Sequence, residues 1–377
     1  MTMIDTDLPA ALLGGLSPHA FMRRHWQKKP LLVRQALPVD APFVSRAQLF
    51  QLAAREGVES RLVVHDRDGW TLRHGPLPRR VLPPLKQPRW SLLVQGLDLH
   101  LDAAHRLMQR FRFVPDARLD DVMVSYASDG GGVGPHFDSY DVFLLQIHGR
   151  RRWRVGRIAR PELQPDVPLK ILANFKPEQE WLLEPGDMLY LPPRWAHDGV
   201  AEGDCMTCSI GFRAAGRDEL ARDLLQRLFD RQLPLHDDRI YRDAGQGATD
   251  RPARLPEALL AFAESAVAST LREPGWLECA LGEVLSEPKP TVWFDPGSGL
   301  RRGAGVALDR RTRMVYDRLH VFINGEAFRV GGRDATLVRR LADRRALEGR
   351  EVAMLGADAR DQLGQWAEAG WLHADNE

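Results

Sequence analysis

The chain has 377 residues, more than one ordinary hydrophobic core organises, and this length predicts two or three domains. Apolar residues make up 44% of the sequence and charged residues 27%, values typical of a soluble globular protein. The formal net charge is +1, from 52 basic and 51 acidic residues, which excludes a global basic field for nucleic acid or membranes.

Residues 1–110 mix short helical patterns with proline-rich breaks, whereas residues 111–215 contain short β-type runs bounded by Gly, Pro and Asp. No long helix separates these runs. Many short strands joined by tight turns predict an antiparallel sandwich or barrel. The runs are DVMVSYAS (121–128), DVFLLQIHG (141–149), RRWRVG (151–156), EWLLEPG (180–186), MLYLPP (188–193) and CMTCSIGF (205–212).

Helical patterns follow in residues 216–300, where the spacing of apolar residues changes from two to nearly 3.6. The first covers RDELARDLLQRLFDRQL (217–233), and two more cover 255–271 and 276–285. The stretch KPTVWFDPGSG (289–299) is interpreted as a linker. The amphipathic stripes are explained equally by an internal core and by a dimer interface.

The last part, residues 301–377, combines strands with short helices. An Asn-Gly pair within LHVFINGEAFRVG is a strong hairpin signal, and helices are predicted over 334–347 and 358–370, each capped by its first Asp. This pattern suggests a small winged-helix-like module. Its 14 basic and 12 acidic residues are nearly balanced, so no direct DNA binding is expected, because phosphate neutralisation needs clustered cations.

The three cysteines, Cys205, Cys208 and Cys279, provide no disulfide framework, which suggests a reducing compartment. Cys205 and Cys208 are interpreted as core residues, because one C-x-x-C pair is no zinc site. The N-terminus lacks a secretory pattern, and no segment approaches ~18 uninterrupted apolar residues. We therefore expect a cytoplasmic protein with no membrane partner.

A candidate metal site begins at GPHFDSYDVF (134–143). In a strand, His136 and Asp138 point to the same face, because they are two residues apart. A third ligand is offered by His197, in LEPGDMLYLPPRWAHDGV (183–200), if antiparallel strands bring it back beside the first strand. Two histidines and one carboxylate suit Fe(II) and leave three coordination positions open.

The alternative to a metal site is a set of ordinary structural residues. A lone His-x-Asp triplet more often contains a satisfied histidine than a ligand, and a lone Pro-Gly-Asp turn is equally common. Their occurrence together, in order, in the β-rich region favours the metal site. His148 borders an Arg cluster, and the earlier histidines at positions 65, 74, 100 and 105 lack a carboxylate at metal-binding spacing within a similar β context.

An arginine run, GRRRWRVG (149–156), follows the first two ligands. Arg151 should point opposite to Arg150 and Arg152, since neighbouring strand residues alternate. Three solvated arginines are the alternative. Beside an iron centre, an inward guanidinium would bind the distal carboxylate of a 2-oxoacid whose other oxygens chelate the metal. Ser125, on the adjacent predicted strand, is expected to add a hydroxyl hydrogen bond.

These residues resemble the 2-oxoglutarate-dependent oxygenases of the JmjC/cupin superfamily, and among them the bacterial ribosomal oxygenases. The motifs that carry the resemblance are GGGVGPHFDSYDVFLLQIHGRRRWRVG (130–156) and LEPGDMLYLPPRWAHDGVA (183–201), with FMRRHWQKKPLLVRQAL (21–37) as a further similar segment. The family pattern implies an α+β multidomain protein: a double-stranded β-helix (jelly-roll, cupin) JmjC-type catalytic domain with an N-terminal extension in 1–215, a helical dimerisation domain in 216–300 and a winged-helix-like domain in 301–377.

The resemblance also implies roles and a reaction. His136, Asp138 and His197 match the iron ligands, Arg151 the cation for 2-oxoglutarate, and Ser125 a hydroxyl position near that cosubstrate. The implied reaction uses Fe(II), 2-oxoglutarate and O2 to hydroxylate the β-carbon of an arginine in the sixteenth protein of the large ribosomal subunit. The implied assembly is a homodimer.

A substrate guanidinium would need an acidic or aromatic partner, and Asp129 and Tyr140 are candidates near the metal strand. A turn-capping Asp and a packed Tyr are the ordinary alternatives for these two residues.

Three other functions stay open from the sequence. The same fold acts on ribosomal histidines in some relatives, and Arg rather than Lys at position 151 favours the arginine branch. A non-oxygenase cupin that senses a small ligand would usually carry a further His or Glu ligand, which is absent nearby. A catalytically inactive oxygenase fold that serves only as a binding protein would not need all three metal ligands.

Overall fold

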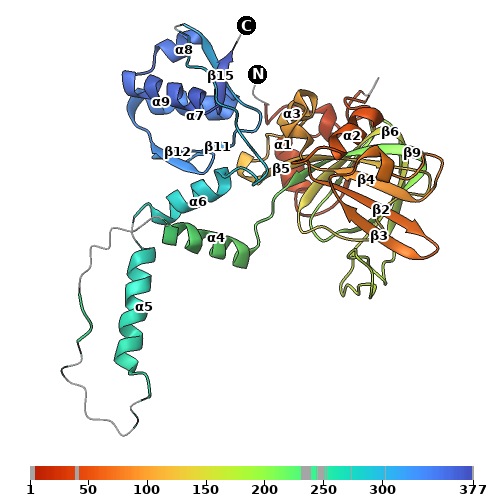
Figure 1. The fold of residues 1–377 in the computed structure, drawn as a ribbon, viewed down its shortest axis with the longest axis horizontal. Coiled ribbons are helices and arrows are strands. Elements are labelled where there is room, and N and C mark those ends of the chain that lie inside the picture. Colours follow the sequence, from red (N-terminus) through yellow and green to blue (C-terminus); the bar gives the residue numbers. More distant parts are fainter. Residues whose placement is uncertain are drawn as a thin grey trace.

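The computed structural model describes residues 5–38, 42–230, 239–242, 244, 251, 253–272, 274–301 and 303–375. A large antiparallel sheet with short helices forms the N-terminal part, further helices follow, and a small α+β module ends the described chain (Figure 1). The expected α+β class with a jelly-roll-type sheet is therefore confirmed.

The large sheet has nine strands in the order β1-β8-β6-β9-β5-β4-β2-β3, with β7 paired to β6. All of its pairs are antiparallel. The strands are β1 (Leu31–Val33), β2 (Ser60–Asp66), β3 (Gly69–His74), β4 (Trp90–Val94), β5 (Leu119–Ala127), β6 (Asp141–Gly156), β7 (Gln179–Leu183), β8 (Met188–Leu191) and β9 (Ala196–Phe212).

Short helices before and between the first strands cover one face of this sheet. Helix α2 starts with a capping box, in which Ser45 and Gln48 satisfy each other's backbone amides. The α-helices are α1 (Pro18–Arg24), α2 (Arg46–Ala53) and α3 (Asp102–Gln109), and the 3-10 helices are η1 (Ala11–Leu13), η2 (Arg79–Val81), η3 (Leu97–Leu99) and η4 (Asp116–Arg118).

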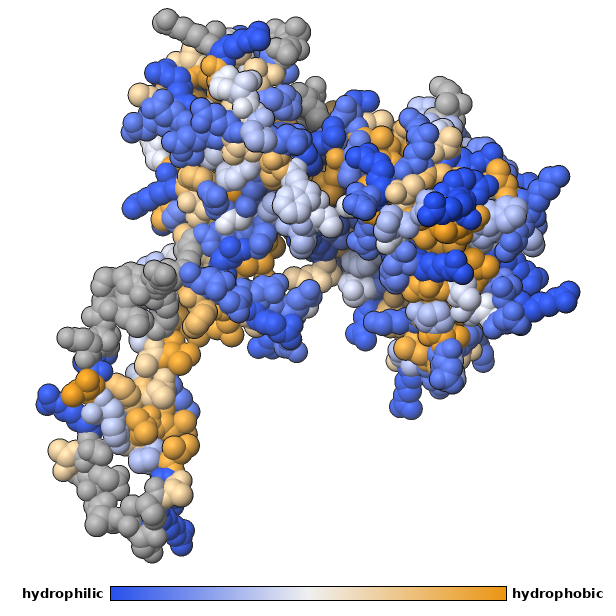
Figure 2. Space-filling view, in the orientation of Figure 1, coloured by the Kyte–Doolittle hydropathy of each residue, from blue (hydrophilic) through white to orange (hydrophobic). Residues whose placement is uncertain are grey.

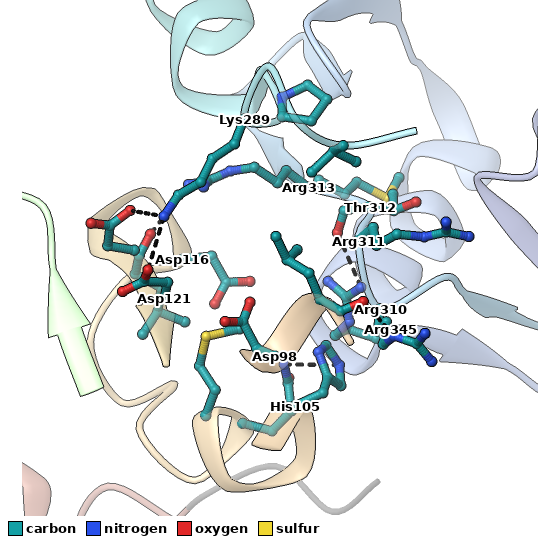
Figure 3. Close-up of a pocket in the computed structure, with 18 of the residues that line it drawn as sticks. Asp98, His105, Asp116, Asp121, Lys289, Arg310, Arg311, Thr312, Arg313 and Arg345 are labelled. Carbon is teal, nitrogen blue, oxygen red and sulfur yellow. Dashed lines mark hydrogen bonds and ion pairs between the residues drawn. The ribbon is translucent and has the colours of Figure 1, made fainter. Parts of the chain in front are cut away.

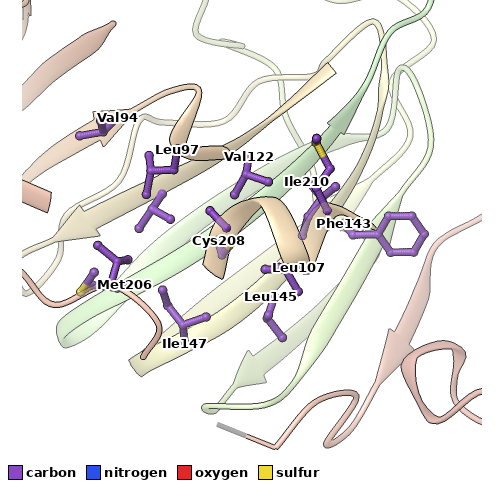
Figure 4. Packing of buried hydrophobic residues seen from close by; sticks show 14 of the residues in the cluster. Val94, Leu97, Leu107, Val122, Phe143, Leu145, Ile147, Met206, Cys208 and Ile210 are labelled. Atoms are coloured by element: carbon purple, nitrogen blue, oxygen red, sulfur yellow. The ribbon is translucent and has the colours of Figure 1, made fainter. Parts of the chain in front are cut away.

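Alternation along the central strands creates two cores. On β6, Phe143 and Leu145 join the larger core under the helices, whereas Val142 and Leu144 join a smaller core inside the folded sheet. Figure 4 shows the larger core, with Leu107 of α3 packed over side chains from β5, β6 and β9. The smaller core, which also contains Trp153 and Val155, lies on the face of the sheet that carries the site described below.

Three local expectations about the strands were wrong. The runs 141–149 and 151–156 form one strand, β6, because register shifts near His148 absorb the irregularity that Gly149 introduces. Strand β9 begins at Ala196, so the run expected at 205–212 is only its second half, and His197 lies inside a long strand. His136 and Asp138 lie in a loop, where a single antiparallel bridge joins His136 to His197.

Helices α4 (Arg217–Asp230), α5 (Glu257–Leu271) and α6 (Trp276–Ser286) follow the sheet. Helix α6 contacts α4 on one side and the C-terminal strands on the other. Helix α5 extends away from α4 and from the C-terminal strands (Figure 1). Apolar side chains lie along its visible face (Figure 2).

The C-terminal module contains two three-stranded sheets, of order β14-β10-β15 and β11-β12-β13, and three helices. The predicted Asn-Gly hairpin joins β12 to β13. Its elements are β10 (Gly305–Leu308), β11 (Met314–Tyr316), β12 (His320–Ile323), β13 (Glu326–Arg329), α7 (Gly332–Arg344), β14 (Ala346–Leu347), α8 (Gly349–Ala353), α9 (Ala357–Glu368) and β15 (Leu372–Asp375).

The predicted N-caps of the last helices were wrong. Helix α7 is capped by Gly331 and α9 by Gly356, so Asp334 and Asp358 lie in the first turns. Asp334 instead accepts a hydrogen bond from the backbone amide of Gly356, 3.0 Å away, and so links the two helices. The domain limits at 215/216 and 300/301 stay predictions. No helix among the described residues has the length and apolar character needed to span a bilayer.

Candidate active site

Two histidines and one aspartate meet at one end of the folded sheet. The ligand atoms of His136, Asp138 and His197 all lie within 4.8 Å of one another, close enough to share one ion. The Asp138 carboxylate is 3.7 Å from His197 Nε2. Among the residues that the structure describes, no further His, Cys, Asp or Glu joins this group. Three protein ligands leave half of an octahedral shell open.

Backbone hydrogen bonds hold the loop that carries the first two residues against β9. The amide and carbonyl groups of His136 and His197 exchange both hydrogen bonds, at 3.0 and 2.7 Å. The carbonyl of Asp138 accepts a hydrogen bond of 2.8 Å from the amide of Arg194, which lies just before β9. The ligands are therefore fixed from two segments about sixty residues apart, as expected, although the first segment is not a strand.

Each imidazole is oriented by the carbonyl two residues before it. His136 Nδ1 lies 2.9 Å from the Gly134 carbonyl, and His197 Nδ1 lies 3.0 Å from the Trp195 carbonyl. A carbonyl only accepts, so each Nδ1 carries the proton and each Nε2 keeps its lone pair. Both rings then present a neutral donor nitrogen toward Asp138, as metal ligands require.

Burial favours the neutral form of the innermost ligand. His197 is buried, and its desolvation, followed by the neighbouring His136, lowers its pKa to about 4, against an opposing effect of Asp138. Neutral imidazoles with one carboxylate form a hard-to-borderline donor set that fits Fe(II). The residues present therefore fit the metal that the motif implies.

Arg151 points inward from β6 beside this group. Its side chain is 4% exposed, whereas Arg150 and Arg152 form ion pairs at the surface, so the expected alternation is present. Arg151 makes no ion pair with any carboxylate in the described parts of the chain, its Nε has no partner, and burial lowers its pKa. An unpaired buried cation is costly, and a bound carboxylate would balance it.

Hydroxyl groups from two neighbouring strands surround this guanidinium. Arg151 Nη1 donates to Ser125 Oγ at 3.2 Å and to Thr207 Oγ1 at 3.4 Å. Thr207 Oγ1 in turn donates to Gln146 Oε1 at 2.9 Å. Because Ser125 and Thr207 are directly opposed in the β5–β9 pair, both face the same side of the sheet.

Gly199 gives Arg151 its space. A Cβ at this position would lie 2.7 Å from the Trp153 ring and 2.8 Å from Arg151 Nε. The Gly199 carbonyl also accepts a hydrogen bond of 3.1 Å from Arg151 Nη2. Only glycine therefore allows the guanidinium and the indole to approach β9 together.

The two expected substrate contacts differ in their surroundings. The hydroxyl of Tyr140 lies by Asp138, and its burial, together with the Asp138 charge, raises the pKa of the phenol, while 38% of the residue stays exposed. Asp129 is exposed, and its carboxylate accepts a hydrogen bond of 2.8 Å from the amide of Gly203. Tyr140 thus adjoins the three ligands, whereas the contact of Asp129 is that of a turn residue.

Sequence reasoning missed Thr207, Gln146 and Gly199. The signal for Thr207 was available, because Cys205, Thr207 and Ser209 alternate along a strand and Thr207 is polar at a position that proves buried. Gln146 and Gly199 carried no such signal, because their roles depend on which residues oppose them across β6 and β9.

Comparison with known proteins places this geometry in a family. The JmjC domain family matches residues 106–220, and the ROXA-like winged helix family matches residues 274–373. A relative from Haemophilus influenzae, named probable ribosomal oxygenase, is 30% identical over 98% of this chain and 98% of its own length. The chain belongs to the JmjC-domain ribosomal oxygenases.

Three comparisons with proteins from Escherichia coli extend this result. The ribosomal protein uL16 3-hydroxylase is 40% identical to this ribosomal oxygenase over 56% of the chain, and the aligned part spans 57% of that relative. The X-ray structure of E. coli YcfD superposes with a TM-score of 0.83 at 29% identity, covering 94% of this chain and 97% of that one. A YcfD structure in complex with cobalt and 2-oxoglutarate superposes with a TM-score of 0.81 at 28% identity, covering 96% and 99%.

Proposed function

We propose that this ribosomal oxygenase uses Fe(II), 2-oxoglutarate and O2 to hydroxylate the β-carbon of an arginine side chain in the large-subunit ribosomal protein uL16. Family membership supports the reaction class, and the name of the E. coli relative supports the substrate. One observation of this structure carries the proposal: three facial ligands lie beside a buried arginine that has no carboxylate partner among the described residues.

We assign the ion to His136, Asp138 and His197, and the distal carboxylate of 2-oxoglutarate to Arg151 with Ser125. Thr207 joins this assignment, because it contacts the same Arg151 nitrogen as Ser125. When bound, the ferrous ion and 2-oxoglutarate together supply activation of O2 and the oxidising power for attack on an unactivated C–H bond.

The chain's own residues orient and shield the reactants. The Gly134 and Trp195 carbonyls fix both imidazole tautomers, so no proton needs to leave His136 or His197 when the metal binds. Trp153 lies with its ring centroid 5.8 Å from that of His197 and belongs to the inner apolar core. This packing keeps water away from the inner side of the site and limits stray oxidation.

We assign the substrate guanidinium to the exposed side, at Tyr140. A partly exposed phenol ring attracts a planar cation, and Tyr140 adjoins Asp138. Asp129 remains a second proposed contact through its remaining carboxylate oxygen. A Tyr140→Ala substitution should raise the KM for peptide more than the KM for 2-oxoglutarate.

The function is tested with purified protein, iron, 2-oxoglutarate and a uL16 peptide that contains the candidate arginines. Succinate should form, and mass spectrometry should find one added oxygen atom on one arginine of the peptide. Succinate without peptide oxidation would refute the substrate assignment, and oxidation of a histidine peptide instead would support the other branch. No iron-dependent turnover, but tight 2-oxoglutarate binding, would favour a sensor.

We further propose that the enzyme is a homodimer joined through α4 and α5. Leu260, Val267 and Leu271 lie at helical spacing on one face of α5, and Leu260 and Val267 are 55% and 60% exposed. Phe229 at the end of α4 is 82% exposed. A monomer would leave these apolar side chains in water, whereas a second copy would bury them.

Light scattering after size-exclusion chromatography tests the dimer. Leu260→Lys should shift the wild-type dimer toward monomer, because it places a charge in the apolar stripe. Ser265→Lys, on the opposite face of α5, is the matched control and should stay dimeric. A monomeric wild type, or equal behaviour of both variants, would contradict the assembly.

Because the proposed substrate is a ribosomal protein, we place the enzyme in the cytoplasm. We do not expect its C-terminal module to bind DNA directly.

A further inference from the structure

A cavity of about 70 Å³, lined by several charged side chains, lies between the catalytic part and the C-terminal module (Figure 3). One wall comes from η3, α3, η4 and the start of β5. The opposite wall comes from the segments 288–292 and 310–315 and from Arg345. The proposed dioxygenase reaction uses none of these residues.

Most charges around the cavity are paired. Arg112 contacts Asp116 through two nitrogens at 2.8 and 2.5 Å. Lys289 lies 3.2 Å from Asp120 and 3.1 Å from Asp121, and Arg213 lies 3.3 Å from Asp120, so two cations balance these two carboxylates. These groups therefore leave no free charge for a ligand.

Two further cationic side chains on the C-terminal wall, Arg310 and Arg311, are also paired. Arg310 contacts Asp102 at 2.7 Å, and Arg311 contacts Asp309 at 2.8 Å. The charges of these ion-paired residues cancel, so the net charge of the cavity comes from the charged residues that form no ion pair.

Two arginines form no ion pair with any described carboxylate. Arg313 donates to the carbonyl of Leu119 at 3.2 Å, and Arg345 donates through one nitrogen to the carbonyls of Asp309 and Thr312 at 2.7 and 3.0 Å. Each guanidinium has five N–H groups, so most of these donors have no partner in the part of the chain that is described.

Their surroundings make these two charges expensive. Burial lowers the pKa of Arg313 to about 10, with a further contribution from Arg213, and it lowers the pKa of Arg345 to about 10, with a further contribution from Arg112. Both remain cationic at neutral pH. The opposing free charge is Asp98, whose carboxylate accepts a hydrogen bond from the Val122 amide. Two free cations against one carboxylate leave the cavity positive.

A third donor lines the same cavity. His105 Nε2 lies 3.2 Å from Gln109 Nε2, which can only donate, so His105 Nε2 accepts and Nδ1 carries the proton. This Nδ1 is buried and has no partner. Burial, followed by the charge of Arg345, lowers the pKa of His105 to about 3, so the ring is neutral. An unpaired N–H donor is thus added to two unpaired cations.

We propose that this cavity binds a small tetrahedral oxyanion, phosphate or sulfate, through Arg313, Arg345 and His105. One water needs about 10–15 Å³, so a cavity of about 70 Å³ has room for roughly five non-hydrogen atoms, the number in either ion. The ion accepts hydrogen bonds from both walls and therefore joins the C-terminal module to α3 of the catalytic part.

Thermal unfolding of the full chain tests the site. The probes are inorganic phosphate and sulfate, each titrated at constant ionic strength against chloride. We expect the Tm of the wild type to rise and then saturate with phosphate, sulfate or both. Arg313→Met should raise the half-saturating concentration at least tenfold. Arg333→Met, at an exposed position of the same module, should behave like the wild type.

The control separates binding from a general salt effect, since both ions strengthen apolar burial in any protein. A rise without saturation, or an equal rise in the Arg313→Met and Arg333→Met variants, would overturn the proposal. If Arg313→Met does not fold, calorimetric titration of the wild type decides: one ion bound per chain supports the site, and no bound ion overturns it.

Discussion

Replacing Arg151 by Met should separate cosubstrate binding from folding. In the wild type the guanidinium is buried, and its hydrogen bonds are to Ser125, Thr207 and the Gly199 carbonyl. After the substitution both hydroxyls keep a hydrogen bond, Ser125 to the Thr207 carbonyl and Thr207 to Gln146. Because an unpaired buried charge is also removed, we expect the free energy of unfolding of the empty protein to change by no more than about 1 kcal/mol.

The effect on 2-oxoglutarate should be much larger. Hydrogen bonds to a charged group contribute about 1.5–3 kcal/mol, and a loss of about 2 kcal/mol raises Kd roughly 30-fold. At a ligand concentration of about 100 times the wild-type Kd, binding stabilises the wild type by about 2.7 kcal/mol. At the same concentration the variant would gain only about 0.9 kcal/mol.

Thermal unfolding with and without 2-oxoglutarate measures this difference, with a redox-inactive divalent ion in place of iron so that no turnover occurs. Arg152→Met is the matched control, because Arg152 lies one position away and forms ion pairs with Glu180 and Glu202 at the surface. It should respond to 2-oxoglutarate like the wild type. Wild-type stabilisation of the Arg151→Met protein would refute the assignment of the carboxylate to Arg151.

Three further predictions follow from the site and its surroundings. Asp138→Ala should abolish iron retention and succinate formation, while the free energy of unfolding of the empty protein changes by less than about 1 kcal/mol. Metal analysis that finds iron bound to this variant would contradict the role of Asp138 as a ligand. Gly199→Ala should cost about 1–3 kcal/mol of stability and raise the KM for 2-oxoglutarate, since its Cβ would displace Arg151; an unchanged KM would count against this packing. Burial raises the pKa of Asp98 to about 6, so folding favours its protonated form. The contribution of Asp98 to the free energy of unfolding is largest below the pKa of about 4 that it has in the unfolded chain. This contribution falls by roughly 3 kcal/mol as the pH rises to 6 and is constant above that pH. Asp98→Asn should remove this loss of stability. A difference in the free energy of unfolding between wild type and Asp98→Asn that does not vary between about pH 4 and 7 would contradict the prediction.

Much of the site was predictable because the relevant signals are local. The residue types and order of His136, Asp138 and His197 specify a donor set, and the alternation of a strand places Arg151 opposite to Arg150 and Arg152. The prediction that His136 lies on a strand was wrong. The loop still brings the ligands together, because a single antiparallel bridge between His136 and His197 holds it beside β9.

The sequence by itself determined the class of fold, the donor set of the candidate metal site and the inward direction of Arg151, because each follows from the spacing of neighbouring residues. Only the tertiary structure decided that Arg151 has no carboxylate partner among the described residues, that Gly199 and Thr207 shape its pocket, and that Arg313 and Arg345 face a cavity. These properties depend on the register between β5, β6 and β9 and on the packing of two separate modules. Contacts between residues far apart in the chain are set by how the whole molecule buries its apolar surface, and no local pattern encodes them.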